Sequence, residues 1–215
     1  MATAVHDFRL LLSACVHTAR RAGRIIVDTY KTGELGARNK KAKGEDGRTV
    51  EEMSPTEVLT VADSAAQDAI VTTMRHLFPG LRIVGEEGDV PQSAAPSTLA
   101  DLDNLDHVPV PAALAESLTH ADTCLWVDPL DGTKEFVLGR TENVAVLIGV
   151  AVKDRPVAGV VFQPFVGGPG GTITYGAVGA GVFGDPAGAP QPPPAQLSLV
   201  MSQAHAGNPR IAAGL

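Results

Sequence analysis

The stretch W-V-D-P-L-D-G-T at residues 126–133 joins an apolar run to a turn that carries two aspartates. The apolar residues have the composition of a buried strand, which we expect to end at Val127. Proline and Asp-Gly pairs are ordinary turn residues, so a tight turn with incidental acids is one interpretation. In the other, Asp128, Asp131 and the Leu130 carbonyl present three oxygens to a hard cation such as Mg²⁺.

The spacing of these two aspartates bears on the type of chemistry. Phosphatases that attack with an aspartyl nucleophile carry D-x-D-G-T, whereas here Pro129 stands two positions before Asp131. This spacing excludes an aspartyl nucleophile. Metal-assisted hydrolysis with water as the nucleophile remains, and it needs hard oxygen ligands from other segments as well.

Two other segments offer such oxygens, and each also has a plainer structural interpretation. Asp63 stands at the start of a predicted helix, where Thr60-x-x-Asp63 matches a capping box. Glu86 and Glu87 lie between glycines after a short predicted strand, where a solvated turn is the ordinary interpretation. Their order along the chain, with D-P-L-D-G-T third, favours one shared site over separate caps and turns.

The remaining pattern predicts an α/β domain. Apolar residues at steps of three and four predict one helix from Phe8 to a stop at Gly33 and another from Ala62 to Leu77. Polar residues 153–156 predict the turn of a hairpin. The predicted strands are residues 81–84, 124–127, 143–152, 157–162 and 172–183.

Two long segments are expected at the surface of this domain, which we assign to residues 1–184. The charged residues 39–55 read as a solvated, mobile loop, and residues 89–121, with four prolines, as an insertion holding one or two helical turns at 114–120. Residues 185–196 contain five prolines and indicate a linker. Residues 197–215 would begin a second α/β domain.

Composition limits the class of partner. The chain has 215 residues, with 17 Lys and Arg against 24 Asp and Glu, and the net charge of −7 argues against nucleic acid. We find no run long enough for a membrane span and no secretory signal. Two cysteines are too few for a disulfide framework, so we expect a cytoplasmic protein with a small-molecule partner.

Four segments resemble blocks of a known family, in the family's order. They are L-T-V-A-D at 59–63, I-V-G-E-E at 83–87, W-V-D-P-L-D-G-T-K-E-F at 126–136 and N-V-A-V-L-I-G-V-A at 143–151. The family is that of the magnesium-dependent, lithium-sensitive phosphomonoesterases, which include inositol monophosphatase, fructose-1,6-bisphosphatase and 3′(2′),5′-bisphosphate nucleotidase. The resemblance implies a layered αβαβα fold whose C-terminal α/β layer is largely missing from this chain.

The resemblance also implies a role for each matching position. Asp63 would pair with Thr133 to orient and deprotonate the attacking water. The implied Mg²⁺ ligands are Glu86, Asp128, the Leu130 carbonyl and Asp131, and the implied substrate-binding residues are Gly132, Thr133, Ser202 and His205.

The substrate class follows from the branch of the family. K-E-F at 134–136 resembles the bisphosphate nucleotidases, which implies hydrolysis of adenosine 3′,5′-bisphosphate, and of its sulfated precursor, with release of phosphate. The alternative enzyme is an inositol phosphate phosphatase of the same fold. No W-D-x-x-A segment, which supplies a further metal-binding Asp in the family, follows Val200. We favour a truncated gene product, and a catalytically inactive metal-binding or regulatory protein stays open.

Overall fold

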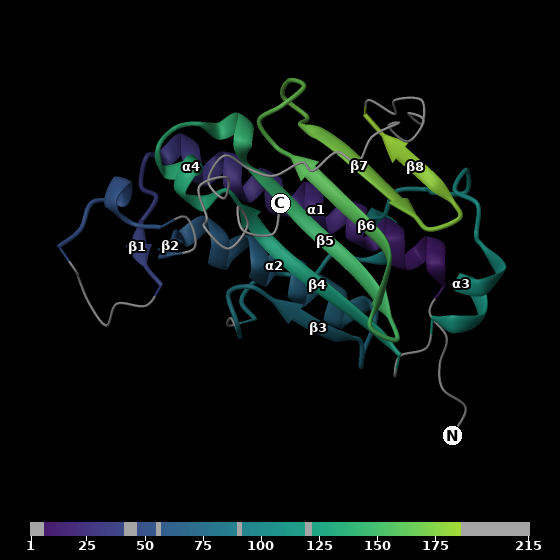
Figure 1. Ribbon diagram of the computed structural model, residues 1–215. Coiled ribbons are helices and arrows are strands. Elements are labelled where there is room, and N and C mark those ends of the chain that lie inside the picture. The colour runs from purple at the N-terminus through teal and green to yellow at the C-terminus, as the bar shows by residue number, and fades with distance from the viewer. Residues whose placement is uncertain (1–6, 41–46, 55–56, 90–91, 119–121, 186–215) are drawn as a thin grey trace, which may run out of the picture.

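The computed structural model describes residues 7–40, 47–54, 57–89, 92–118 and 122–185. In this part of the chain, helices α1 (Phe8–Thr32) and α2 (Val61–Leu77) pack together against one face of a six-stranded sheet (Figure 1). Its strand order is β3-β4-β5-β6-β7-β8, parallel between β3 and β4 and antiparallel elsewhere. The strands are β3 (Arg82–Gly85), β4 (Thr123–Asp131), β5 (Ala145–Val152), β6 (Arg155–Gln163), β7 (Thr172–Ala177) and β8 (Gly181–Gly184).

Smaller elements surround this core. Strands β1 (Arg38–Asn39) and β2 (Val58–Leu59) form a separate antiparallel pair. The short helices are α3 (Ala112–Ser117), α4 (Thr133–Val137), and the 3₁₀ turns η1 (Val50–Glu52), η3 (Leu99–Asp101) and η4 (Thr141–Asn143). Figure 1 places β1 and β2 at the same end of the molecule as α4, and α3 at the other end.

Both long helices are confirmed, with ends that match the sequence signals. The Asp7 side chain caps α1 by accepting from the Leu10 N–H at 3.0 Å. Gly33 ends α1 in the left-handed region, with φ 73°, as a C-terminal glycine does. The capping box at the start of α2 is also confirmed, because Thr60 and Asp63 make it.

The hairpin between β5 and β6 is confirmed, and the strand predicted over 172–183 is found as strand but is divided in two. Lys153 and Asp154 both have positive φ, as the type I′ two-residue hairpin turn requires. The segment 172–183 instead forms two strands, β7 and β8, because the chain turns at Gly179, where φ is 79°. Small residues lie on both sides of this turn, so the hydrophobic pattern of the sequence does not show where the first strand ends.

The two segments predicted to lie at the surface are partly buried. In 89–121, Leu105, Val108, Leu114 and Leu118 enter the main core. Their spacing is irregular because the backbone is irregular, so no period revealed their burial. In 39–55, Asn39 and Met53 are buried, and Lys40 points into the molecule. The prediction of solvated surface segments is therefore wrong for these residues.

Of the predicted linker 185–196, only Asp185 is among the described residues, and residues 197–215, which include Ser202 and His205, lie outside them. The assigned domain boundaries thus stay predictions. No helix in the described ranges has the length and apolarity to cross a bilayer. Cys15 and Cys124 are both buried and free.

Candidate active site

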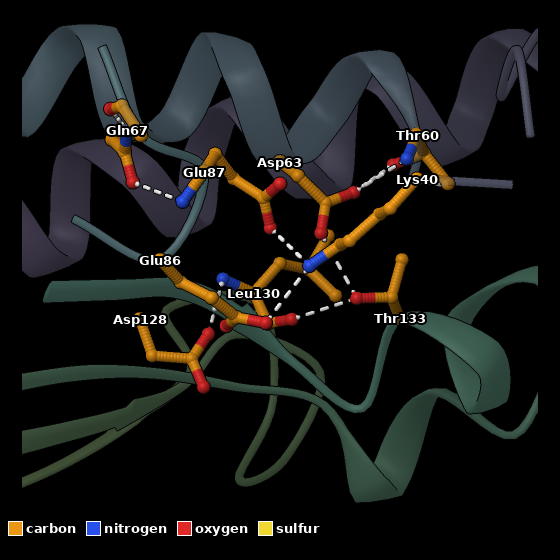
Figure 2. A network of polar contacts seen from close by, with 10 residues as sticks. Lys40, Thr60, Asp63, Gln67, Glu86, Glu87, Asp128, Leu130 and Thr133 are labelled. Atoms are coloured by element: carbon orange, nitrogen blue, oxygen red, sulfur yellow. Dashed lines mark hydrogen bonds and ion pairs between the residues drawn. The ribbon is translucent and has the colours of Figure 1, made fainter. Parts of the chain in front are cut away.

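The candidate site lies where the C-terminal ends of β3 and β4 meet the start of α2, α4 and the end of β1. Figure 2 shows side chains from α2, β4 and α4, and from the residues that directly follow β1 and β3, turned toward one another. Asp63, Glu86, Asp128, Leu130 and Thr133 lie in one network of polar contacts. The structure therefore brings together residues that are separated by up to 70 positions in the sequence.

A bulge in β4 orients the two aspartates of D-P-L-D. The strand does not end at Val127 as predicted, since Asp128 still pairs with Leu147 and Asp131 with Ala145. Between these two pairs β4 advances by three residues and β5 by two, so β4 carries one extra residue, which forms a β-bulge. Residues three apart point to opposite faces of a regular strand, and the extra residue lets both Asp128 and Asp131 lie within reach of the charge of Glu86.

Gly132 makes the tight exit from this strand. It adopts φ 82°, and a Cβ at this position would lie 2.5 Å from the Asn143 carbonyl oxygen. A side chain is therefore excluded on both conformational and steric grounds. The following Thr133 begins α4 with its hydroxyl directed into the site.

Asp63 and Thr133 form a buried pair. The Thr133 hydroxyl lies 2.9 Å from Asp63 Oδ1 and 3.0 Å from the Leu130 carbonyl oxygen, so its one hydrogen has two acceptors. Asp63 Oδ2 accepts from both the N–H and the hydroxyl of Thr60. The capping box thus fixes one carboxylate oxygen and leaves the other for Thr133.

The G-E-E-G turn is held from two sides. The Glu86 N–H donates to the Val127 carbonyl at 2.9 Å, which ties the turn to β4. The Gln67 amide accepts from the Glu87 N–H at 3.0 Å and donates to the Gly88 carbonyl at 2.7 Å. Gly85 leaves room for Gln67, because a Cβ at residue 85 would lie 2.3 Å from the amide oxygen.

Lys40 supplies positive charge to this turn. Its Nζ lies 2.8 Å from Glu86 Oε1 and 2.6 Å from Glu87 Oε1. Figure 2 shows the ammonium in the middle of the acidic side chains. Burial by itself lowers the pKa of Lys40, but the hydrogen bonds and charges of Glu86 and Glu87 together raise it. Lys40 is therefore charged at neutral pH.

Among the described residues, the other two carboxylates of the site, those of Asp128 and Asp131, have no positively charged partner of this kind. Burial, the charge of Glu86, a hydrogen bond with Glu86 and the charge of Asp131 raise the pKa of Asp128 to about 7. Burial and the charge of Glu86 also raise the pKa of Asp131, against a hydrogen bond from the Gly132 N–H. No cationic side chain in the described ranges pairs with either aspartate. A cation would relieve this repulsion.

The donor chemistry fits a hard divalent cation. Glu86, Asp128, Asp131 and the Leu130 carbonyl all offer oxygen, which Mg²⁺ prefers. Within the described residues, no group of three or more acidic, histidine or cysteine side chains lies close enough together to hold a metal ion. Lys40 engages the Glu86 carboxylate instead.

Sequence reasoning missed two residues of the network. Gln67 follows Asp63 by four positions on α2, so it lies on the same helix face, and this spacing could have identified it. Lys40 lies among other charged residues, and nothing in that run distinguishes it from a solvated lysine. Its partners Glu86 and Glu87 lie 46 and 47 positions further along the chain.

Comparison with known proteins places these features in a family. The model of the inositol monophosphatase family matches residues 8–208. The human 3′(2′),5′-bisphosphate nucleotidase 1 is 33% identical over 183 residues, which cover 81% of this chain and 55% of the human protein. The protein of the same name from Dictyostelium discoideum is 35% identical over 161 residues, covering 73% and 47%. The chain spans about half the length of the curated relatives it matches.

Solved structures share the fold. The extragenic suppressor protein suhB from Bartonella henselae matches with a TM-score of 0.53 and 22% identity, covering 80% of this chain and 51% of that one. CysQ from Bacteroides thetaiotaomicron, a bacterial member of the inositol monophosphatase family, matches with a TM-score of 0.50 and 24% identity, covering 82% and 49%. These likenesses confirm the expected α/β fold. Since the family model extends over most of its length, this chain belongs to the inositol monophosphatase family.

Proposed function

We propose that this chain provides the catalytic residues of a Mg²⁺-dependent phosphomonoesterase that hydrolyses adenosine 3′,5′-bisphosphate to AMP and phosphate. The observation that carries this proposal is the buried Asp63–Thr133 pair beside three acidic oxygen donors. The nucleotidase names of the relatives at 31–35% identity support the substrate class. K-E-F at 134–136 supports the same branch.

The proposed division of labour follows from the hydrogen bonds. Thr133 donates to Asp63 Oδ1, so its oxygen can accept a hydrogen bond from a water molecule. The water proton can then pass to Thr133 while the hydroxyl proton passes to Asp63. The water loses one proton, Asp63 gains one and Thr133 is unchanged, which is general base catalysis.

The cation sites are proposed at the uncompensated carboxylates. Glu86, Asp128, the Leu130 carbonyl and Asp131 would hold Mg²⁺, which when bound supplies positive charge to the phosphate and makes water easier to deprotonate. If the Leu130 carbonyl is engaged, the Thr133 hydrogen is left with Asp63 as its acceptor. Gly132, whose φ of 82° favours glycine, is proposed to let the backbone approach the phosphate closely.

The test is phosphate release by the full 215-residue chain with Mg²⁺. We expect faster release from adenosine 3′,5′-bisphosphate than from inositol 1-phosphate. Asp131→Ala should lower the rate by about 10²-fold or more, since a hard ligand is lost. Asp28→Ala is the matched control, because Asp28 is an exposed acid on α1 outside the network, and its rate should equal that of the parent.

The other outcomes separate the alternatives. Preference for inositol 1-phosphate would replace the proposed substrate class with the inositol phosphates. Mg²⁺ binding that Asp131→Ala removes, without phosphate release from either compound, would identify an inactive metal-binding protein. Equal rates for the parent and Asp131→Ala would refute the assignment of Asp131 as a ligand.

A further inference from the structure

Lys40 and Glu87 have no role in the function proposed above, yet they lie inside its site. The Lys40 N–H donates to the Glu57 carbonyl at 2.7 Å, next to the pairing of β1 with β2, so its backbone is fixed. From there the side chain reaches Glu86 and Glu87, and only 20% of it is exposed. Two carboxylates therefore share one partly buried ammonium.

These two carboxylates hold Lys40 unequally. The Glu87 side chain is 6% exposed, and its N–H is fixed by Gln67. The Glu86 side chain is 44% exposed and is the proposed cation ligand. Removing Lys40 from Glu87 would leave a buried, unpaired carboxylate, whereas water can solvate Glu86. We therefore expect the Lys40–Glu87 contact to be kept and the Lys40–Glu86 contact to be the one that exchanges.

We propose that Lys40 is a built-in counter-ion that competes with the divalent cation for Glu86, and that Glu87 retains the ammonium when the cation takes Glu86. This inference rests on the metal-dependent function proposed above. An ammonium and a divalent cation on one carboxylate repel each other, so each weakens binding of the other. Lys40 thereby stabilises the cation-free site and lowers its affinity for the cation.

The test is Mn²⁺ binding to the full chain, with free Mn²⁺ counted by electron paramagnetic resonance. Lys40→Met, which removes the charge and keeps the length of the side chain, should tighten Mn²⁺ binding by about tenfold. Lys40→Arg is the matched control, because it keeps the charge and should stay within about threefold of the parent. Equal or weaker binding by Lys40→Met would overturn the proposal.

Glu87 is tested through its dependence on Lys40. Glu87→Gln releases the ammonium to Glu86 and should weaken Mn²⁺ binding by about fivefold in the parent chain. In the Lys40→Met background the same change should have no effect, because Glu87 acts through Lys40. Equal weakening in both backgrounds would make Glu87 a direct ligand and overturn its assigned role.

Thermal unfolding gives a second readout that does not depend on activity. In a chelator, Lys40→Met should unfold at a lower temperature than the parent, since the carboxylates lose their counter-ion. Saturating Mn²⁺ should remove or reverse this difference. A parent chain that binds no Mn²⁺ would overturn both this inference and the proposed function. A parent that binds Mn²⁺ with the same affinity as Lys40→Met would overturn the inference alone.

Discussion

Helix α2 carries two buried aspartates, Asp63 and Asp68, whose surroundings differ. Asp63 faces the candidate site, where it accepts from Thr60 and Thr133. Asp68 accepts from Thr72 within the helix and from Ser93 and Ala94. The first aspartate joins helix and sheet at the site, and the second ties an irregular segment to the helix.

The pKa values of the two carboxyl groups move in opposite directions. Burial raises the pKa of Asp63, and the hydrogen bonds from Thr60 and Thr133 and the charge of Lys40 do not offset it. Burial also acts to raise the pKa of Asp68, but the hydrogen bonds from Ser93, Thr72 and Ala94 outweigh it, and the pKa is lowered. The charged form is therefore disfavoured for Asp63 at the candidate site and favoured for Asp68, which ties residues 93–94 to α2. The Asp63 carboxylate, whose pKa is raised, lowers the stability of the folded chain at neutral pH. The Asp68 carboxylate, whose hydrogen bonds outweigh its burial, increases that stability.

The largest expected effect is on catalysis by Asp63→Asn. The amide cannot take the proton that the proposed mechanism delivers through Thr133, so kcat should fall by about 10²–10⁴-fold. Thermal stability should change little, because the disfavoured charge is removed while the amide oxygen of Asn can still accept the Thr60 hydrogen bonds of the capping box. Phosphate release and circular dichroism on one preparation measure both. A rate within tenfold of the parent would exclude Asp63 as the base.

The second effect is on stability, from Asp68→Ala. The Ser93 and Ala94 N–H groups and two hydroxyls lose a charged acceptor, which should cost about 3 kcal/mol of unfolding free energy. Urea unfolding followed by circular dichroism measures this loss. Asp68→Asn, which keeps one acceptor oxygen, is the graded control and should lose less. A loss equal to that of an exposed acid such as Asp28→Ala would mean that the tie is not structural.

The two aspartates also show what the sequence could predict. Thr60-x-x-Asp63 is a local pattern, so the capping box could be predicted, as could both long helices. The prediction that D-P-L-D forms a turn after Val127 is wrong, because β4 continues through a bulge to Asp131. The tie made by Asp68 could not be predicted in this way, because apart from Thr72 in the same helix its partners lie 25 and 26 positions away in an irregular segment. Lys40 is similar, since only tertiary structure pairs it with Glu86. Long-range polar contacts from irregular backbone leave no period in the sequence, and the same holds for the buried leucines of 89–121.

A smaller effect is expected from Lys134→Met. Lys134 follows Thr133 on α4, and its Nζ donates to the Glu51 and Met53 carbonyls at 2.8 and 2.7 Å. It therefore ties η1 to the helix that carries Thr133, the proposed catalytic hydroxyl, much as Asp68 ties its own segment. Loss of these bonds should cost about 1 kcal/mol. Amide hydrogen exchange should rise in residues 49–53, and the exposed Lys31→Met is the control that should leave it unchanged.

The smallest effect is the pH dependence of the Asp68 tie, and it separates charge from shape. With a lowered pKa, Asp68 binds fewer protons in the folded than in the unfolded chain, so its stabilisation is complete above its ordinary value of 3.8 and is lost as the pH falls through the lowered pKa. The gap in urea midpoint between the parent and Asp68→Asn should be constant from about pH 7 to about pH 5 and shrink below about pH 4. Other titrating groups act on both proteins alike and cancel in the gap. A gap that persists unchanged to the lowest pH at which both fold would mean that Asp68 acts through packing, and that its charge does not distinguish it from Asp63.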